Sequence, residues 1–269
     1  MEAVTEVGAA GLYLYAIVPE PETPPALGAG VGGAPLRLVS AGGVAAVVHD
    51  GPTAPLTGPD EEVTEWILQH SAVVERVWAL GGTALPAGFN VIVAPADGES
   101  AEERLRGWLT ASAGAFAARL RALSGLVELR VEIDLDQEVA ARSDPEATQL
   151  RDSLGERPPG VRRLLERKLD ELERDAAERR ADELYRDARR RLAEHSVDLA
   201  ENRRAHAPRG FVTVLNMAVL AERDAVEPIG SVLADVREEQ PGVRVSFIGP
   251  WPPYSFTGAL DVAEAGGSL

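Results

Sequence analysis

The alternation of apolar and polar positions predicts strands at the start of the chain. Residues 12–18 are rich in aromatic and branched side chains, which is typical of a strand. Residues 36–40 and 44–49 flank Ala41-Gly42-Gly43, and glycines supply the positive φ that a tight hairpin turn needs. Residues 84–94 have a similar extended pattern. We therefore expect a strand, a hairpin and a further extended segment in the first part of the chain.

Helical spacing appears on both sides of the last of these segments. The first helix is expected to begin at Asp60 as its cap, and it carries an apolar stripe that includes Ile67. Ser100 and Glu103 have the spacing of a capping box, which predicts a second helix through about residue 122.

A strict two-residue alternation follows over residues 126–135. Its apolar positions alternate with charged ones, namely Glu128, Arg130, Glu132 and Asp134. This pattern predicts a strand with one buried face and one solvated face. We expect this strand to open a second domain.

Residues 161–205 contain no glycine or proline and are dominated by Leu, Arg, Glu and Ala, which indicates one long helix or a helical hairpin. Apolar residues, Leu184 and Leu192 among them, recur every three or four positions, but residues 177–183 are mostly charged and suggest a bend or a turn. A straight helix of this length would measure about 65 Å, so part of it must project or fold back. Two interpretations stay open: a solvated face with many ion pairs, or a coiled-coil-like arm for association.

The rest of the second half supplies more strands and helices. Asp144-Pro145 predicts the start of a short helix, and residues 211–220 form an apolar run suited to a central strand. Asp224 and Glu227 have capping-box spacing ahead of another helix, and residues 243–248 read as a last strand.

This order of elements predicts an α+β protein with two ferredoxin-like α/β sandwich domains. The first is placed at residues 11–125 and the second at residues 126–258. The second domain carries residues 161–205 as a long helical, coiled-coil-like arm. Residues 259–269 are expected to form a flexible tail.

The last predicted strand leads into Gly249-Pro250-Trp251-Pro252-Pro253-Tyr254-Ser255-Phe256, hereafter the aromatic segment. Its three prolines exclude a helix, and its three aromatic side chains bring large apolar area. Burial of these side chains in the core is the more common outcome for such residues. The alternative is that Trp251, Tyr254 and Phe256 form a surface for a partner.

Composition limits the possible partners. The chain has 269 residues and a formal net charge of −16, which argues against nucleic acid and against an anionic membrane surface. It has no cysteine, which fits a reducing cytoplasm. Its first residues lack a basic region and no segment approaches the length of a spanning helix, so neither a signal peptide nor a membrane anchor is expected.

Catalytic chemistry is not indicated by any spacing. The four histidines, His49, His70, His195 and His206, lie far apart, and His70 is more readily explained as a packed or capping residue than as a ligand or base. Gly28, Gly30 and Gly33 spell G-x-G-x-x-G, but prolines surround them where a dinucleotide site needs a strand and a helix. We therefore predict no catalytic residue, no cofactor site and no metal site.

The aromatic segment, together with the apolar residues 211–220 before it, resembles the C-terminal motif of the gas vesicle protein F/L family. Residues 12–18, residues 39–48, the helix with His70 and the segment Leu85-Pro-Ala-Gly-Phe-Asn-Val-Ile are similar in the same order, so the resemblance covers about residues 12–258. The chain departs from the family pattern at Gly88 and Asn90, and again at Gly160-Val-Arg-Arg-Leu-Leu.

The resemblance implies a non-enzymatic, cytoplasmic protein of the gas vesicle. Such a protein binds the small hydrophobic shell subunit, supports nucleation or assembly of the vesicle, and is associated with other gas vesicle proteins. The candidate contacts are Trp251, Tyr254 and Phe256, with Leu184 and Leu192 of the arm. Two other classes stay open: a ligand-binding regulatory module without catalytic activity, and an enzyme built on scattered carboxylates and His70.

Overall fold

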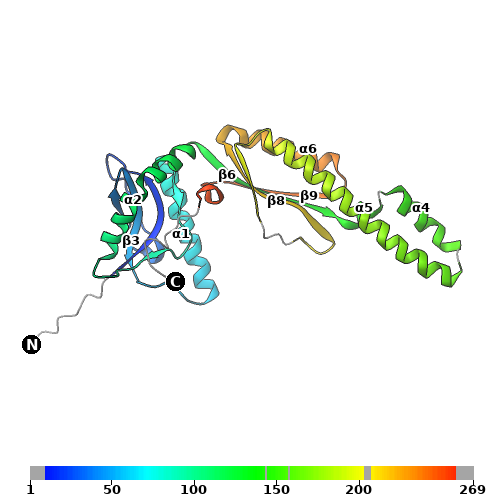
Figure 1. Cartoon of the computed structure of the whole chain (residues 1–269), viewed down its shortest axis with the longest axis horizontal. Coiled ribbons are helices and arrows are strands. Elements are labelled where there is room, and N and C mark those ends of the chain that lie inside the picture. The colour runs from blue at the N-terminus through cyan, green and yellow to red at the C-terminus, as the bar shows by residue number, and fades with distance from the viewer. Residues whose placement is uncertain (1–9, 143, 157, 203–206, 259–269) are drawn as a thin grey trace, which may run out of the picture. The chain divides into compact units, whose positions relative to one another are not determined.

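The structure is a computed structural model that describes residues 10–142, 144–156, 158–202 and 207–258. Its contacts divide the chain into two compact units, one formed by Met1–Val127 with Trp251–Leu269 and the other by Glu128–Pro250. Each unit has a sheet and helices of its own (Figure 1). The aromatic segment after Pro250 thus groups with the first unit, whereas the sequence placed it in the second. The expected tail at residues 259–269 lies outside the described residues.

The first unit contains a five-stranded sheet and two long helices. Its elements are β1 (Gly11–Pro19), a 3-10 turn (Val31–Gly33), β2 (Arg37–Ala41), β3 (Val44–Gly51), α1 (Asp60–Gly81), β4 (Leu85–Pro86), β5 (Ile92–Val93) and α2 (Ala101–Ala122), with a second 3-10 turn at Tyr254–Phe256. The strand order is β2-β3-β1-β4, and β5 also pairs with β1. The predicted hairpin is confirmed, because β2 and β3 pair antiparallel and Gly42 and Gly43 turn between them with φ of 66° and 81°.

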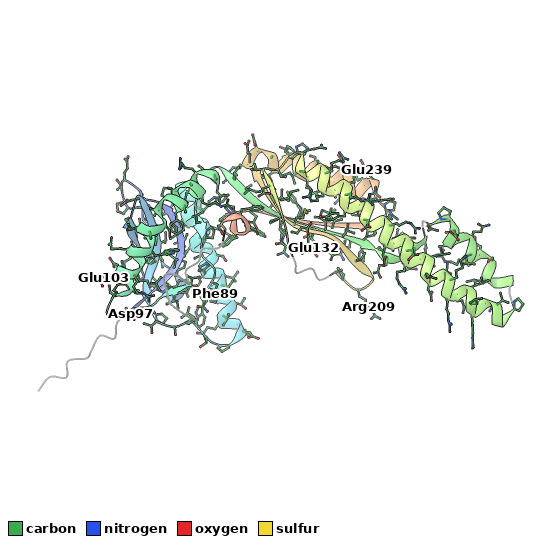
Figure 2. All side chains as sticks on the ribbon, in the orientation of Figure 1. Phe89, Asp97, Glu103, Glu132, Arg209 and Glu239 are labelled. Carbon is green, nitrogen blue, oxygen red and sulfur yellow. The ribbon has the colours of Figure 1, made fainter. Side chains whose placement is uncertain are left out.

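Strand β1 is the centre of this unit. It is buried at eight consecutive positions, and both α1 and α2 pack on it, as expected of a strand covered on both faces. The predicted capping box at the start of α2 is confirmed, since the Ser100 hydroxyl accepts from the Glu103 amide at 3.2 Å and the Glu103 carboxylate accepts from the Ser100 amide at 2.8 Å. Glu103 is labelled in Figure 2.

Two details of α1 differ from the prediction. Asp60 is the first helical residue rather than the cap, because Pro59 holds the cap position and no side chain caps the helix. Ile67 is 42% exposed, whereas the buried face consists of His70, Val73, Val74, Val77 and Trp78. The predicted stripe is therefore confirmed at Val74 and Val77 and wrong at Ile67.

The second unit contains a four-stranded sheet and four helices within the described residues. Its elements are β6 (Leu126–Asp136, whose first two residues belong to the first unit), α3 (Gln137–Arg142), α4 (Pro145–Ser153), a 3-10 turn (Leu154–Glu156), α5 (Pro159–Ala193), β7 (Asp198–Glu201), β8 (Phe211–Glu222), a 3-10 turn (Arg223–Ala225), α6 (Val226–Glu239) and β9 (Val243–Trp251). The strand order is β7-β8-β6-β9. The predicted capping box at Asp224 is wrong, because no side chain caps α6 or the turn before it.

Helix α5 is one continuous helix, so the hairpin reading of residues 161–205 is wrong. Its inner half packs on β8 and α6, and its outer half runs beyond the sheet with α4 beside it (Figure 1). The charged stretch at residues 177–183 lies within this single helix, and Ala176 before it and Leu184 after it are both buried. Helices α3 and α4 also pack on α5.

The helix also ends earlier than predicted, at Ala193 instead of residue 205. The chain turns and forms β7, which pairs antiparallel with β8 from Asp198↔Leu220 to Glu201↔Met217. The Val197 amide already donates to the Leu220 carbonyl at 2.7 Å. The predicted helix is too long because helix propensity takes no account of pairing with a strand that lies further along the chain.

The alternation in β6 is confirmed on its apolar face, where Val127, Leu129, Val131, Ile133 and Leu135 are all 0% exposed. The charged face is less solvated than predicted, since Glu128 and Asp134 are each only 8% exposed. The Asp134 carboxylate accepts a hydrogen bond from the Thr213 hydroxyl of β8 at 2.9 Å. Neighbouring strands thus cover part of a face that the sequence assigned to water. Figure 2 shows the side chain of Glu132 on the side of the sheet away from α5.

Candidate functional surfaces

The aromatic segment holds its three aromatic side chains in three different environments. Phe256 is 5% exposed, Trp251 is half-buried and Tyr254 is 37% exposed. The prediction of burial is confirmed for Phe256, and a partner surface at Trp251 and Tyr254 stays a prediction. Phe256 anchors it in a core, while Tyr254 and one side of Trp251 are presented to solvent.

Gly249 is required where this segment leaves β9. Its φ is +122°, and an added Cβ would lie 2.8 Å from the Glu128 carbonyl oxygen of β6. The peptide that joins Gly249 to Pro250 is cis. The glycine therefore lets the backbone approach the neighbouring strand closely before the proline-rich stretch begins.

Buried polar chemistry is concentrated elsewhere, in a cluster of Tyr13, Tyr15, His49 and His70, hereafter the Tyr-His cluster. All four side chains are 5% exposed or less. The Tyr13 hydroxyl lies 3.1 Å from His70 Nδ1, and the Tyr15 hydroxyl lies 2.9 Å from His49 Nδ1. Phe89, labelled in Figure 2, meets the Tyr13 and His70 rings edge-on with centroids 6.4 and 6.1 Å away.

Backbone groups complete the hydrogen bonding of both tyrosines. The Val31 amide donates to the Tyr15 hydroxyl at 2.7 Å, and the Asn90 amide donates to the Tyr13 hydroxyl at 3.1 Å. Each hydroxyl therefore accepts from an amide and also shares a hydrogen bond with a histidine Nδ1, whose direction depends on the histidine tautomer. His70 Nε2 donates to the Ala87 carbonyl at 3.1 Å, so Nδ1 of the neutral ring accepts from the Tyr13 hydroxyl.

Burial sets the charge state of this cluster. It lowers the pKa of His49 and of His70 below the ordinary value of 6.5, and it raises the pKa of Tyr13 and of Tyr15 to about 12. All four side chains are therefore neutral near pH 7. The cluster connects β1 and β3 to α1, to the loop before β2 and to the loop between β4 and β5.

The enzymatic reading of His70 required a buried carboxylate within hydrogen-bond reach. Its partners in the structure are a tyrosine hydroxyl and a backbone carbonyl instead. No pocket described for the structure is lined by His70 or His49. The geometry of the cluster therefore fits the joining of elements better than the binding of a reactant.

Sequence reasoning singled out His70 but missed Tyr13, Tyr15 and His49. The available signal was the two-residue spacing of the tyrosines, which places them on one face of a strand. The β-bulge in β1 could not be predicted from the sequence. The pairing of β1 with β3 shifts between Leu14 and Ala16, so Tyr15 is the extra, unpaired residue of the bulge.

The glycine-rich loop directs its backbone amides to the protein itself. The Val31 amide donates to Tyr15, and the Gly32 amide donates to the Gln69 side chain of α1 at 2.9 Å. At Gly30 an added Cβ would lie 2.3 Å from the Tyr15 hydroxyl. These glycines serve a close approach between loop and core, so the loop does not have the geometry of a phosphate-binding turn.

The arm candidates from the sequence are core residues in the structure. Leu184 is 4% and Leu192 is 0% exposed, on the face of α5 that packs on the sheet. Ion pairs hold the outer helices together, including Arg151–Glu173 and Arg179–Asp144, the latter at 3.0 Å. The apolar side chains that α5 presents to solvent are instead Val161 and Leu164, which are 46% and 68% exposed.

Several pockets in the described residues have volumes suited to a ligand, and two of them bear on the binding alternative. The one in the second unit measures about 600 Å³, and charged side chains of α3, α4 and α5 line most of it. The one in the first unit measures about 360 Å³ and is mainly apolar; it lies between the end of β1, the proline-rich loop and the end of α1. The described residues contain no group of three potential metal ligands, and no described helix is long and apolar enough to cross a membrane.

Comparison with known proteins places these features in a family. The model of the gas vesicle synthesis protein GvpL/GvpF family matches residues 11–258. Gas vesicle protein L1 of Halobacterium salinarum is 30% identical over 258 residues, covering 91% of this chain and 90% of that protein. Gas vesicle protein L of a Streptomyces species is 30% identical over 260 residues, covering 93% of each.

The comparison of folds agrees with the comparison of sequences. The crystal structure of gas vesicle protein GvpF from Microcystis aeruginosa superposes with a TM-score of 0.65 at 18% identity, covering 92% of this chain and 98% of that one. The predicted α+β class is thereby confirmed, and the structure shows two antiparallel sheets. With its family model spanning nearly the whole described chain, this protein belongs to the gas vesicle synthesis protein GvpL/GvpF family.

Proposed function

We infer that this chain is an accessory protein of gas vesicle assembly that acts in the cytoplasm, binds the small hydrophobic shell subunit and supports nucleation or assembly of the vesicle. The observation that carries this inference is the family match over residues 11–258. A subunit that forms an apolar wall tends to aggregate, and an acidic binder with a net charge of −16 could keep it soluble and ordered until it is incorporated.

The aromatic segment is the proposed contact for the shell subunit. Tyr254 and Trp251 present aromatic area to solvent on a backbone stiffened by three prolines, which lowers the entropy lost on binding. Aromatic side chains of this kind often dominate the energy of protein interfaces. Phe256 supports them from the core and is not itself a contact.

The outer helices are the second candidate surface. We propose that α3 and α4, packed on α5, form the coiled-coil-like arm, and that the second unit is a ferredoxin-like domain. The order β6, α5, β7, β8, α6, β9 with the sheet order β7-β8-β6-β9 supports that assignment. The exposed positions of α5 are the ones available to a partner, since Leu184 and Leu192 face the sheet.

The test is co-purification of the shell subunit with the tagged chain after co-expression. Trp251→Ser together with Tyr254→Ser should remove most of the co-purified subunit. Leu80→Ser together with Val197→Ser is the matched control, because these apolar side chains are 57% and 59% exposed on other surfaces. The control variant should bind as the unmodified chain does.

A shortened arm separates the two surfaces. Deleting residues 161–205 would remove β7 and the buried Leu184 and Leu192, so the sheet would lose part of its core. Replacing only residues 146–175 with a short Gly-Ser linker keeps the inner half of α5. Loss of the complex in this variant would move the contact to the arm. No complex with the folded, unmodified chain would refute shell binding.

The ligand-binding module remains the alternative. The apolar pocket of the first unit supports it, but Glu20 and Thr23 are the only polar side chains among its lining residues. Specific small-molecule sites usually have several convergent polar groups. The pocket therefore supports a binding function less strongly than the family match supports assembly.

A further inference from the structure

The outer end of α5 combines exposed apolar and basic side chains in an acidic protein. Residues 161–168, hereafter the basic tip, contain four basic residues and one acidic residue. Leu164 is 68% exposed, and Arg167 and Lys168 follow it at the three- and four-residue spacings that bring side chains together on a helix. Val161, 46% exposed, lies one turn before it.

These cations have few and long contacts within the described part of the chain. Arg163 and Arg167 have no ion-pair or hydrogen-bond partner there, and Lys168 reaches Glu146 only at 4.0 Å. Arg162 approaches the Gly155 carbonyl at 3.5 Å. The basic tip therefore has charge available for a partner.

The position of these cations is also unfavourable for the helix itself. The first turn of a helix is stabilised by acidic residues, and α1 and α2 follow this rule with Asp60, Glu61 and Glu62 and with Glu102 and Glu103. The first turn of α5 has no acidic residue, and Arg162 and Arg163 lie near its start. The helix dipole thus gives no reason for basic residues at this place.

A surface with the opposite charge and a matching apolar centre lies on α1 of the first unit. Leu68 is 61% exposed on the outer face of α1, with Glu65 three residues before it and Glu61 and Glu75 two turns away on either side. This acidic face belongs to a helix with five acidic residues and one basic residue. The four apolar side chains Val161, Leu164, Ile67 and Leu68 are half of the large exposed ones among the described residues.

We propose that the basic tip of one copy of this chain docks on the acidic face of α1 of a second copy. Leu164 packs against Leu68, while Arg167 and Lys168 pair with Glu61 and Glu65. The two surfaces differ, so the contact is head-to-tail. It closes as a dimer if two copies exchange both contacts, and it grows into a longer oligomer if they do not. This self-association goes beyond the binding of a shell subunit.

Sedimentation velocity of the full chain tests the proposal over a range of concentrations, at about 0.05 M and about 0.5 M salt. The unmodified chain should form species larger than the monomer as its concentration rises, and added salt should dissociate them. A chain that stays monomeric at every concentration would overturn the proposal. This holds also if the tip binds α1 of its own chain, because that contact leaves the chain monomeric.

Charge reversal identifies the surfaces. Arg167→Glu with Lys168→Glu, or Glu61→Arg with Glu65→Arg, should each weaken self-association at least about tenfold, because attraction becomes repulsion. The matched control is Arg186→Glu with Arg189→Glu, which changes the charge by the same amount on an exposed part of the same helix. The control should associate like the unmodified chain, and circular dichroism should show all variants folded.

The decisive sample is a mixture of the two reversed variants. Each variant alone has two surfaces of the same sign, whereas in the mixture each tip meets a complementary face. Association should return in the mixture and in the chain that carries all four substitutions. If both reversed variants still associate, another surface mediates the contact. If each reversed variant is monomeric and their mixture is also monomeric, the tip and the α1 face are not partners.

Discussion

The Tyr15 hydroxyl makes two hydrogen bonds at a β-bulge in the core of the first unit. It accepts from the Val31 amide at 2.7 Å and bonds His49 Nδ1 at 2.9 Å. The proline-rich loop is thereby attached to the central strand through one oxygen atom. Removal of that atom leaves a buried amide and a buried ring nitrogen without this partner.

We therefore expect Tyr15→Phe to lower the free energy of unfolding of the first unit by about 2–4 kcal/mol, since two buried groups lose their partner. Urea unfolding measures the change. Tyr254→Phe serves as the control, because Tyr254 is 37% exposed and water can replace its hydroxyl contacts. Equal effects of the two substitutions would contradict the role given to the buried hydroxyl.

The histidines of the Tyr-His cluster predict a pH dependence. Burial lowers the pKa of His49 and His70 below 6.5, although the nearby Asp50 carboxylate opposes this at His49. The unfolded chain thus binds protons that the folded chain does not. Stability of the first unit should be level above about pH 7 and should fall as the pH drops below about 6.5.

Urea unfolding between about pH 7.5 and about pH 5.5 shows this slope, since most carboxylates stay ionised in that range. His49→Gln and His70→Gln should each make the slope shallower, because glutamine does not titrate. A slope that neither substitution changes would assign the effect to other groups.

Helix α5 shows at the scale of an element how one sequence pattern produces two kinds of surface. Its inner half packs on the sheet through Leu184, Ala188 and Leu192, all 4% exposed or less. Its outer half has only the short helices beside it, and Leu164 is 68% exposed there. The same residue type is therefore core at one end of the helix and surface at the other.

Leu192→Ala should lower the free energy of unfolding of the second unit by about 2–5 kcal/mol, since it removes buried methyl groups and leaves a cavity. Leu164→Ala should change it by less than about 0.5 kcal/mol. Thermal or urea unfolding of both variants provides the comparison. A large loss of stability in Leu164→Ala would show that the outer end of α5 is covered.

Each of the two units of the whole molecule has its own sheet and its own apolar core. Domains with separate cores can unfold as separate cooperative units. We expect two unfolding transitions in urea. Tyr15→Phe should shift only one of them and Leu192→Ala only the other. If both substitutions shift a single common transition, the units unfold together.

Local patterns in the sequence determined many of the elements and the family. The alternation in β6, the capping box of α2 and the glycine turn between β2 and β3 depend on neighbouring residues, so they can be read along the chain. The eight-residue aromatic segment identified the family for the same reason. The α+β class followed from the order of these local elements.

Tertiary contacts decided what local patterns do not contain. Pairing with β8 ends α5 at Ala193 and forms β7, and the bulge at Tyr15 sets the hydrogen bonds of the Tyr-His cluster. Exposure depends on the same contacts: Leu184 and Leu192 face a sheet built from distant residues, while Leu164 on the same helix does not. Surfaces available to partners therefore became visible only in the folded chain, because packing with distant segments determines which side chains remain in water.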